Sequence, residues 1–278
     1  MVWKTITTQL SNPHRADVML SVAGRLAERF EAHLIGLDAT PSFIFAAPTV
    51  ITPADVEAIE AAERERSAEI KEKFDASAVS RAFVAEWREV KLENSDLPGA
   101  VLNHARASDL IVVSQADPNW ELSGMFDFPE RIVMESGRPV LVVPYAGAYG
   151  EIGKRVTVAW SGKREGTRAV FDALPLLKTA EEVTLLCVVG SGADAETGDL
   201  PGAEIAAALA RHGVKVTAQK SVAEDIGVAD DILSRLADSG ADLLVMGAYG
   251  YSRLRQMVFG GVTHHILKHM TVPTLMSH

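Results

Sequence analysis

Two short segments in the first half of the chain recur in the second half, in the same order and at almost the same spacing. Residues 107–113 (ASDLIVV) resemble residues 240–246 (GADLLVM), and residues 137–142 (GRPVLV) resemble residues 271–276 (TVPTLM). A repeat of this kind indicates that one structural plan is used twice. The length of 278 residues agrees with two domains, because domains usually run to about 100–150 residues.

Each half alternates short apolar runs with segments of helical periodicity. The runs at 110–113 and 243–246 are continuously apolar, which is typical of parallel strands covered on both faces. Strands are expected over residues 5–10, 33–38, 82–91, 109–114 and 139–144, and again over 155–161, 183–189, 214–220, 241–247 and 272–277. Helices are expected after Asn12-Pro13 and over residues 53–76, 97–106, 129–135, 165–177, 203–212, 228–239 and 262–268. The pattern predicts an α/β fold of two tandem doubly wound domains, residues 1–146 and 153–278, with a glycine-rich connector between them.

Composition disfavours some classes of binding partner and predicts the cellular compartment. The net charge of −10 disfavours binding to nucleic acid or to an anionic membrane, because both require basic surface. No apolar run reaches the roughly 20 residues of a membrane span, and the N-terminus lacks the features of a signal peptide, so a cytoplasmic protein is expected. The single cysteine, Cys187, excludes an intrachain disulfide and is interpreted as a buried apolar residue rather than a reactive thiol.

A glycine-rich segment in the second half carries the main functional signal. Residues 247–263 (GAYGYSRLRQMVFGGVT) leave an expected strand through Gly247 and Gly250 and enter an expected helix through Gly260 and Gly261. Glycine lets a backbone approach a ligand closely, and a helix N-terminus suits phosphate. Three basic and no acidic residues follow Asp242, whereas the matching stretch of the first half, residues 110–144, has two basic and five acidic residues. The second half therefore suits a phosphate ligand and the first half does not.

The spacing Gly247-x2-Gly250-x9-Gly260 resembles the nucleotide loop of ATP-binding universal stress proteins, whose pattern is Gly-x2-Gly-x9-Gly-Ser/Thr. The likeness covers nearly the whole chain as a tandem arrangement. It implies two five-stranded sheets of the adenine-nucleotide alpha-hydrolase type with strand order 3-2-1-4-5, a bound ATP or AMP with or without Mg, and a role in the stress response. It also implies an intrachain pseudo-dimer through the last strands of the two halves, and a possible homodimer. The candidate nucleotide contacts are Ser161, Val188, Gly247, Gly250, Ser252, Arg253, Gly260, Gly261, Val262 and Thr263.

Two positions depart from the family pattern. Gly261 stands where the family has Ser or Thr, which removes one phosphate-binding hydroxyl, and Thr263 is a possible substitute. Ser161 stands where the family has an Asp at the end of the first strand, and a hydroxyl is a weaker hydrogen-bond partner than a carboxylate.

Weaker patterns receive plainer interpretations. The segment 190–195 (GSGADA) fits a dinucleotide fingerprint but lies among carboxylates, so it is interpreted as a flexible loop. His264, His265, His269 and His278 are interpreted as exposed histidines rather than metal ligands, because no acidic ligand lies nearby in sequence. The charge-rich helix at residues 57–73 is expected to be solvated, with partner docking as the alternative.

The first half has an apolar loop in place of the glycine segment. It contains Trp120, Met125, Phe126 and Phe128 and is expected to pack against the sheet or the sister domain, with capture of a hydrophobic ligand as the alternative.

Three functions remain open at this point. The leading hypothesis is a regulatory protein that binds ATP or AMP in the second half and hydrolyses it very slowly at most. The second is an ATP-dependent adenylating enzyme, which would need a Ser-Gly-Gly-x-Asp-Ser loop, of which residues 160–164 (WSGKR) keep only Ser-Gly. The third is a nucleotide-free interaction module in which both sites are vestigial.

Overall fold

The computed structural model describes residues 2–40, 52–79, 83–92, 96–190, 202–223, 227–250 and 261–278. These residues form two compact units. The N-terminal unit comprises residues 2–136 and 148–150, and the C-terminal unit comprises residues 137–147 and 151–278. The predicted domain limits, 1–146 and 153–278, remain a prediction about the repeat, since the compact units assign residues 137–147 to the second body.

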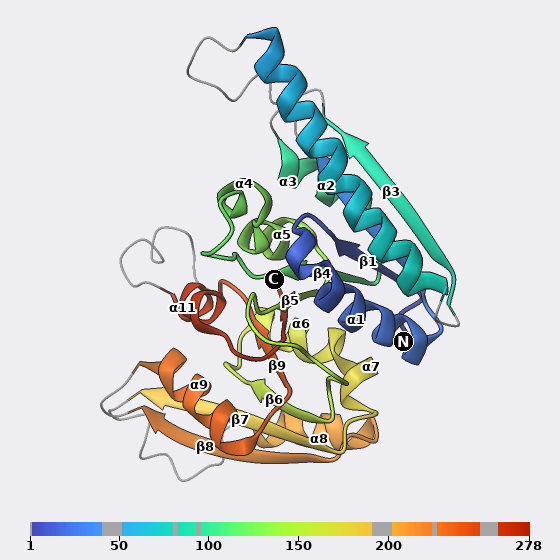
Figure 1. The fold of residues 1–278 in the computed structure, drawn as a ribbon. Coiled ribbons are helices and arrows are strands. Elements are labelled where there is room, and N and C mark those ends of the chain that lie inside the picture. Colours follow the sequence, from blue (N-terminus) through green and yellow to red (C-terminus); the bar gives the residue numbers. More distant parts are fainter. Residues whose placement is uncertain are drawn as a thin grey trace. The chain divides into compact units, whose positions relative to one another are not determined.

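The N-terminal unit is a four-stranded parallel sheet with helices on both faces. Its strand order is β3-β2-β1-β4. Helices α1 and α2 cover one face and α3 and α5 the other (Figure 1). The elements are β1 (Thr5–Gln9), α1 (Pro13–Phe30), β2 (His33–Thr40), α2 (Pro53–Val79), β3 (Ala85–Lys91), α3 (Leu97–Ala105), β4 (Leu110–Ser114), α4 (Ser123–Phe126) and α5 (Pro129–Glu135).

The C-terminal unit has a six-stranded sheet of order β5-β10-β9-β6-β7-β8. All neighbouring strands are parallel except β5 and β10, which pair antiparallel with Leu141 opposite Leu275. Helices α9 and α11 lie side by side (Figure 1). The elements are β5 (Val140–Val143), β6 (Arg155–Ala159), α6 (Arg164–Asp172), α7 (Leu174–Leu177), β7 (Glu182–Gly190), α8 (Ala203–Arg211), β8 (Val216–Ala223), α9 (Val228–Ser239), β9 (Leu243–Gly247), α11 (Val262–His269) and β10 (Thr274–Ser277).

This topology confirms the predicted fold class. The order 3-2-1-4-5 is present as β8-β7-β6-β9-β10 in the C-terminal half, and its first four strands are present in the N-terminal half. The continuously apolar runs are the central strands β4 and β9, and the first four residues of each are buried. The antiparallel pair of β5 and β10 joins the last strands of the two sequence repeats, as the family resemblance implied.

Local chemistry sets several element ends. The Asn12 side chain accepts a hydrogen bond from the backbone N–H of His14 at 2.9 Å, which caps α1 as predicted. The single helix expected over residues 165–177 is instead two helices, α6 and α7, because Pro175 cannot donate a backbone hydrogen bond and occupies the first turn of α7. The short helix α4 was not predicted.

One aspartate of the sequence repeat has the same structural role in both halves. The Asp109 carboxylate accepts from the backbone N–H groups of Lys4 and Thr5, at 2.7 and 3.0 Å, where β1 begins. The Asp242 carboxylate accepts in the same way from Lys154 and Arg155, at 3.0 and 3.2 Å, where β6 begins. The recurrence of Ser/Ala-Asp-Leu therefore reflects strand anchoring rather than ligand chemistry.

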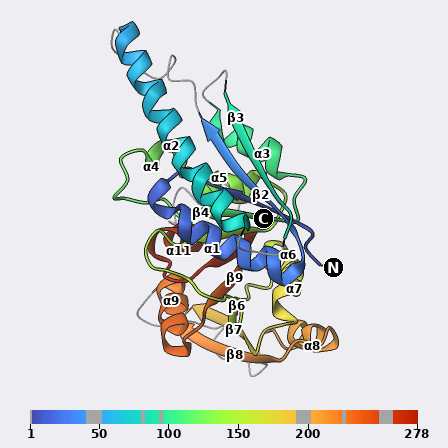
Figure 2. The same ribbon diagram turned by 45° about the vertical axis from the view of Figure 1, so that its right-hand side comes forward.

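Helix α2 extends past the ends of β2 and β3 (Figure 2). Its buried residues are confined to Arg66, Ser67, Ile70 and Phe74, so its first turns are solvated, in agreement with the charge-rich pattern. None of the described helices is long and apolar enough to cross a bilayer.

Candidate functional site

The candidate site lies in the C-terminal unit, where β6 and β9 end at the same edge of a parallel sheet. Gly247, the last residue of β9, packs against the backbone of the first turn of α6. A Cβ at this position would lie 2.5 Å from the carbonyl carbon of Glu165 and would also collide with the backbone nitrogen of Gly166. Only glycine fits, so packing alone explains Gly247.

The turn after β9 is held by hydrogen bonds from two backbone N–H groups and passes close to the start of α6. The backbone N–H of Ala248 donates to the carbonyl of Ser277 at 2.9 Å. Tyr249 has a left-handed φ of 57°, and its backbone N–H donates to the Thr263 hydroxyl at 3.1 Å. A Cβ at Gly250 would lie 3.3 Å from both the Lys163 Cδ and the Glu165 Oε2. The turn is thus fixed between the starts of α6 and α11.

Helix α11 begins at this turn without a side-chain cap. Its N-cap is Gly261, with φ −61° and ψ 150°, and within the described part of the chain a Cβ there would meet no atom within 4 Å. Neither backbone strain nor crowding from described neighbours therefore requires glycine at this position. The uncapped helix N-terminus can accept an anion, since its first N–H groups have no intrahelical acceptor.

Nine of the ten predicted contact residues divide into three groups, and Val188 lies apart from them. Ser161, Gly247 and Gly250 come together at the start of α6, where the Ser161 Oγ lies 3.0 Å from the position a Gly166 Cβ would occupy. Gly261, Val262 and Thr263 form the start of α11, and Thr263 is buried with its oxygen used by Tyr249. Ser252, Arg253 and Gly260 lie outside the described residues.

Val188 lies on the neighbouring strand β7, paired with Ser221 of β8. The backbone N–H of Trp160 donates to the carbonyl of Leu186, so Val188 lies two residues beyond the end of β6, at the carboxyl edge of the sheet. The dinucleotide-like segment 190–195 begins at the last residue of β7, and its other residues lie outside the described ones.

Two residues of this site were not predicted from the sequence. Lys163 is the N-cap of α6, and Glu165 is in its first turn. Both look like ordinary helix-terminus residues in the sequence. The sequence signal for these two residues was Gly250, because a glycine lets the turn after β9 come close to the start of α6 and to the side chains there.

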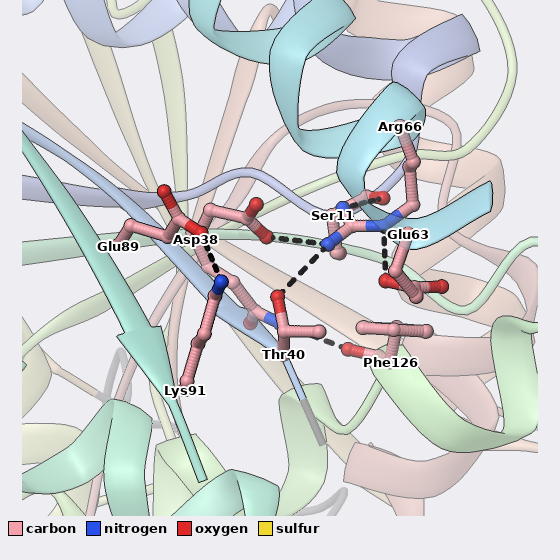
Figure 3. Close-up of polar contacts among 9 residues, drawn as sticks. Ser11, Asp38, Thr40, Glu63, Arg66, Glu89, Lys91 and Phe126 are labelled. Carbon is pink, nitrogen blue, oxygen red and sulfur yellow. Dashed lines mark hydrogen bonds and ion pairs between the residues drawn. The ribbon is translucent and has the colours of Figure 1, made fainter. Parts of the chain in front are cut away.

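The equivalent edge of the N-terminal sheet is filled by the chain itself. Arg66 of α2 is 8% exposed and donates to the Asp38 carboxylate and the Ser11 carbonyl, both at 2.8 Å (Figure 3). It also pairs with the Glu63 carboxylate at 2.9 Å, and its guanidinium lies 5.0 Å from the centre of the Phe126 ring. Burial opposes the charge on Arg66, but its acidic partners, Asp38 foremost, raise its pKa overall.

The apolar loop after β4 closes this edge from the other side. Phe126, labelled in Figure 3, is fully buried. Its ring stacks on that of Trp120 with the ring centres 5.4 Å apart, and its carbonyl accepts a hydrogen bond from the Gln9 side chain, at the end of β1, at 2.9 Å. The expectation that this loop packs against the sheet is confirmed. Next to it, burial raises the pKa of Asp127 to about 6, although the Ser123 hydroxyl and a backbone N–H both donate to its carboxylate.

The C-terminal histidines have an acidic neighbour that the sequence did not reveal. His265 lies 2.8 Å from the Asp230 carboxylate of α9, and its ring lies 4.3 Å from that of His269. Among the described residues, no group of three side chains is arranged to hold a metal ion.

The structural class is a tandem pair of doubly wound α/β units. One of the two units has a glycine turn between its fourth strand and its last helix. The universal stress protein family model matches residues 153–278. The C-terminal half is therefore a universal stress protein domain, and the N-terminal half repeats its strand order over four strands.

Known proteins are similar to parts of this chain or to its fold. YxiE, a universal stress protein of Bacillus subtilis, is 28% identical over 143 residues, which cover 44% of this chain and 97% of YxiE. The universal stress protein Slr1230 of Synechocystis is 39% identical over 51 residues, only 18% of either chain. A universal stress protein structure from Archaeoglobus fulgidus covers 98% of this chain with a TM-score of 0.73 at 15% identity, which is a likeness of fold. Another universal stress protein, crystallised with cAMP, covers 52% of this chain at 18% identity with a TM-score of 0.33.

Proposed function

We propose that the C-terminal domain binds one adenine nucleotide, ATP or AMP, at the edge formed by the ends of β6, β7 and β9. The protein then acts as a cytoplasmic regulatory protein in stress adaptation rather than as an enzyme. Mg accompanies the nucleotide where it carries more than one phosphate, because the described part of this edge has few cations to neutralise a polyphosphate.

One arrangement carries the proposal. The backbone N–H of Tyr249, in the glycine turn after β9 (residues 247–250), donates to the Thr263 hydroxyl and so links this turn to the uncapped start of α11. No described atom lies within 4 Å of the position that a Cβ at Gly261 would occupy. Backbone N–H groups at a helix start, approached without side chains in the way, suit a phosphate. Lys163 adds a positive charge at the same turn.

The N-terminal half is proposed to hold no nucleotide. The edge where a ligand would lie is filled by Arg66 and Phe126, both buried, with Asp38 and Glu63 paired to the arginine. The two carboxylates outnumber the single guanidinium, so this edge would repel phosphate. The two halves therefore differ in function although they share a fold.

A nucleotide-free interaction module is the second candidate, because Gly247 is explained by packing and Glu165 places a negative charge beside Gly250. Nucleotide release separates the two. The protein is purified without added nucleotide and denatured, and the supernatant is resolved by anion-exchange chromatography. Wild type is expected to release ATP or AMP, and Gly250→Asp is expected to release none, because the new carboxylate would face Glu165 and any phosphate.

The matched control is Gly150→Asp. Gly150 is exposed, has no neighbour within 4 Å of an added Cβ among the described atoms, and lies in the N-terminal unit. This variant is expected to retain wild-type nucleotide. If wild type releases none, and millimolar Mg-ATP leaves its melting temperature unchanged, the interaction module is the better assignment.

A further inference from the structure

The site proposed above contains the Glu165 carboxylate, which contributes little to stability through its contacts in the described structure. The Glu165 side chain is 12% exposed, and within the described part of the chain it pairs with Arg164 at 3.1 Å, whose side chain is 80% exposed. Pairs with so exposed a partner contribute little to stability. Its other oxygen, Oε2, points toward Gly250.

This carboxylate lies close to the end of β6. Ser161 stands at the end of β6, and its Oγ packs on Gly166, the residue after Glu165. The first turn of α6 therefore places a carboxylate four residues after Ser161, at the edge of the sheet where β6 ends. The two positions lie at the same helix start.

A carboxylate accepts hydrogen bonds and donates none, so its partner on a ligand must be a donor. A phosphate at the glycine turn is excluded as that partner by like charge. The ribose is the part of a nucleotide adjacent to the phosphate, and its hydroxyls are donors; acidic residues bind ribose hydroxyls in this way in other doubly wound folds. A divalent cation is disfavoured as the partner, because Lys163 and Arg164 flank the carboxylate.

We propose that Glu165 accepts hydrogen bonds from the ribose hydroxyls of the bound nucleotide and makes the site selective for ribonucleotides with free 2′ and 3′ hydroxyls. This inference rests on the proposed nucleotide binding by the C-terminal domain. It assigns to Glu165 the task of distinguishing the sugar, and to the glycine turn the task of holding the phosphate.

The test is calorimetric titration of the full chain with AMP, 2′-deoxy-AMP, 3′-deoxy-AMP and inosine monophosphate. Wild type is expected to bind AMP at least tenfold more tightly than the weaker of the two deoxynucleotides, since bonds to charged groups are the stronger ones. Glu165→Ala is expected to reduce this ratio to about one. Glu165→Gln, which keeps an acceptor oxygen but no charge, is expected to retain part of it.

Glu204→Ala is the matched control, because Glu204 is an exposed residue in the first turn of α8, which has nine residues like α6. It should keep the wild-type ratio. The proposal is overturned if Glu165→Ala binds AMP and still discriminates against the deoxynucleotides, or if it loses instead the distinction between AMP and inosine monophosphate. If wild type binds none of the nucleotides, the proposed function itself fails.

Discussion

The Arg66 cluster is where the N-terminal half departs furthest from a ligand-binding domain, and its energetics can be tested directly. Asp38 is fully buried and Arg66 nearly so, and their charged atoms are 2.8 Å apart. Arg66→Met keeps the aliphatic volume but leaves the Asp38 carboxylate without its cation. Removing one partner of a buried pair costs about 3–5 kcal/mol, because the other charge stays buried without compensation.

The measurement is urea unfolding at pH 7 followed by tryptophan fluorescence. Three of the four tryptophans, Trp3, Trp87 and Trp120, lie in the N-terminal unit, so a Trp160→Phe background makes the signal specific to that unit. Arg66→Met is expected to lower the free energy of unfolding of the N-terminal unit by the stated amount. Asp38→Asn in the same chain should recover much of the loss, since no buried charge then remains at that position.

Arg64→Met is the control on the same helix. Arg64 pairs with Glu60 at 3.5 Å, with side chains 61% and 59% exposed, so its loss should cost less than about 0.5 kcal/mol. A cost below about 1 kcal/mol for Arg66→Met, or no recovery with Asp38→Asn, would refute the interpretation of this cluster as a buried ion pair that closes the edge.

Three further predictions concern other positions. Burial raises the pKa of Asp127 to about 6, above its unfolded value, so the unfolding free energy should fall as pH rises from about 4 to about 6. Asp127→Asn, which keeps an acceptor oxygen, should flatten that part of the plot of urea midpoint against pH, and an unchanged plot would exclude a raised pKa for Asp127. Gly261→Ser should restore a hydroxyl that can donate to a phosphate at the start of α11, tightening nucleotide binding about threefold to tenfold in a calorimetric titration; weaker binding would count against a phosphate at this helix start. Cys187 is buried, and burial raises its pKa, so a thiol reagent such as dithionitrobenzoate should label it only after denaturation; rapid labelling of the native chain would contradict its burial.

The sequence was informative where the cause is local. The apolar runs at β4 and β9 and the Asn12 cap depend on neighbouring residues, and the structure confirms each of them. The prediction of one helix over residues 165–177 was wrong although its cause is also local, because the helical periodicity was given more weight than Pro175, which divides this segment into two helices.

The remaining features depend on contacts between distant residues. Arg66 lies in a helix whose charges pair well among themselves, and nothing in that pattern indicates that this one arginine reaches Asp38, 28 residues earlier. Glu165 likewise has the ordinary role of an acid at a helix start until the turn after β9 brings Gly250 beside it. The antiparallel pair of β5 and β10 followed only from the family resemblance, because either strand alone looks like any other buried strand.

The central claim is that one half of the chain binds a nucleotide and the other is closed by its own side chains. Equilibrium dialysis against saturating radiolabelled ATP with Mg, with the protein concentration determined by amino-acid analysis, counts the sites directly. We predict one nucleotide per chain in wild type and in Gly150→Asp, and none in Gly250→Asp. Two nucleotides per wild-type chain would contradict the closed N-terminal edge, and none would contradict nucleotide binding by the C-terminal domain.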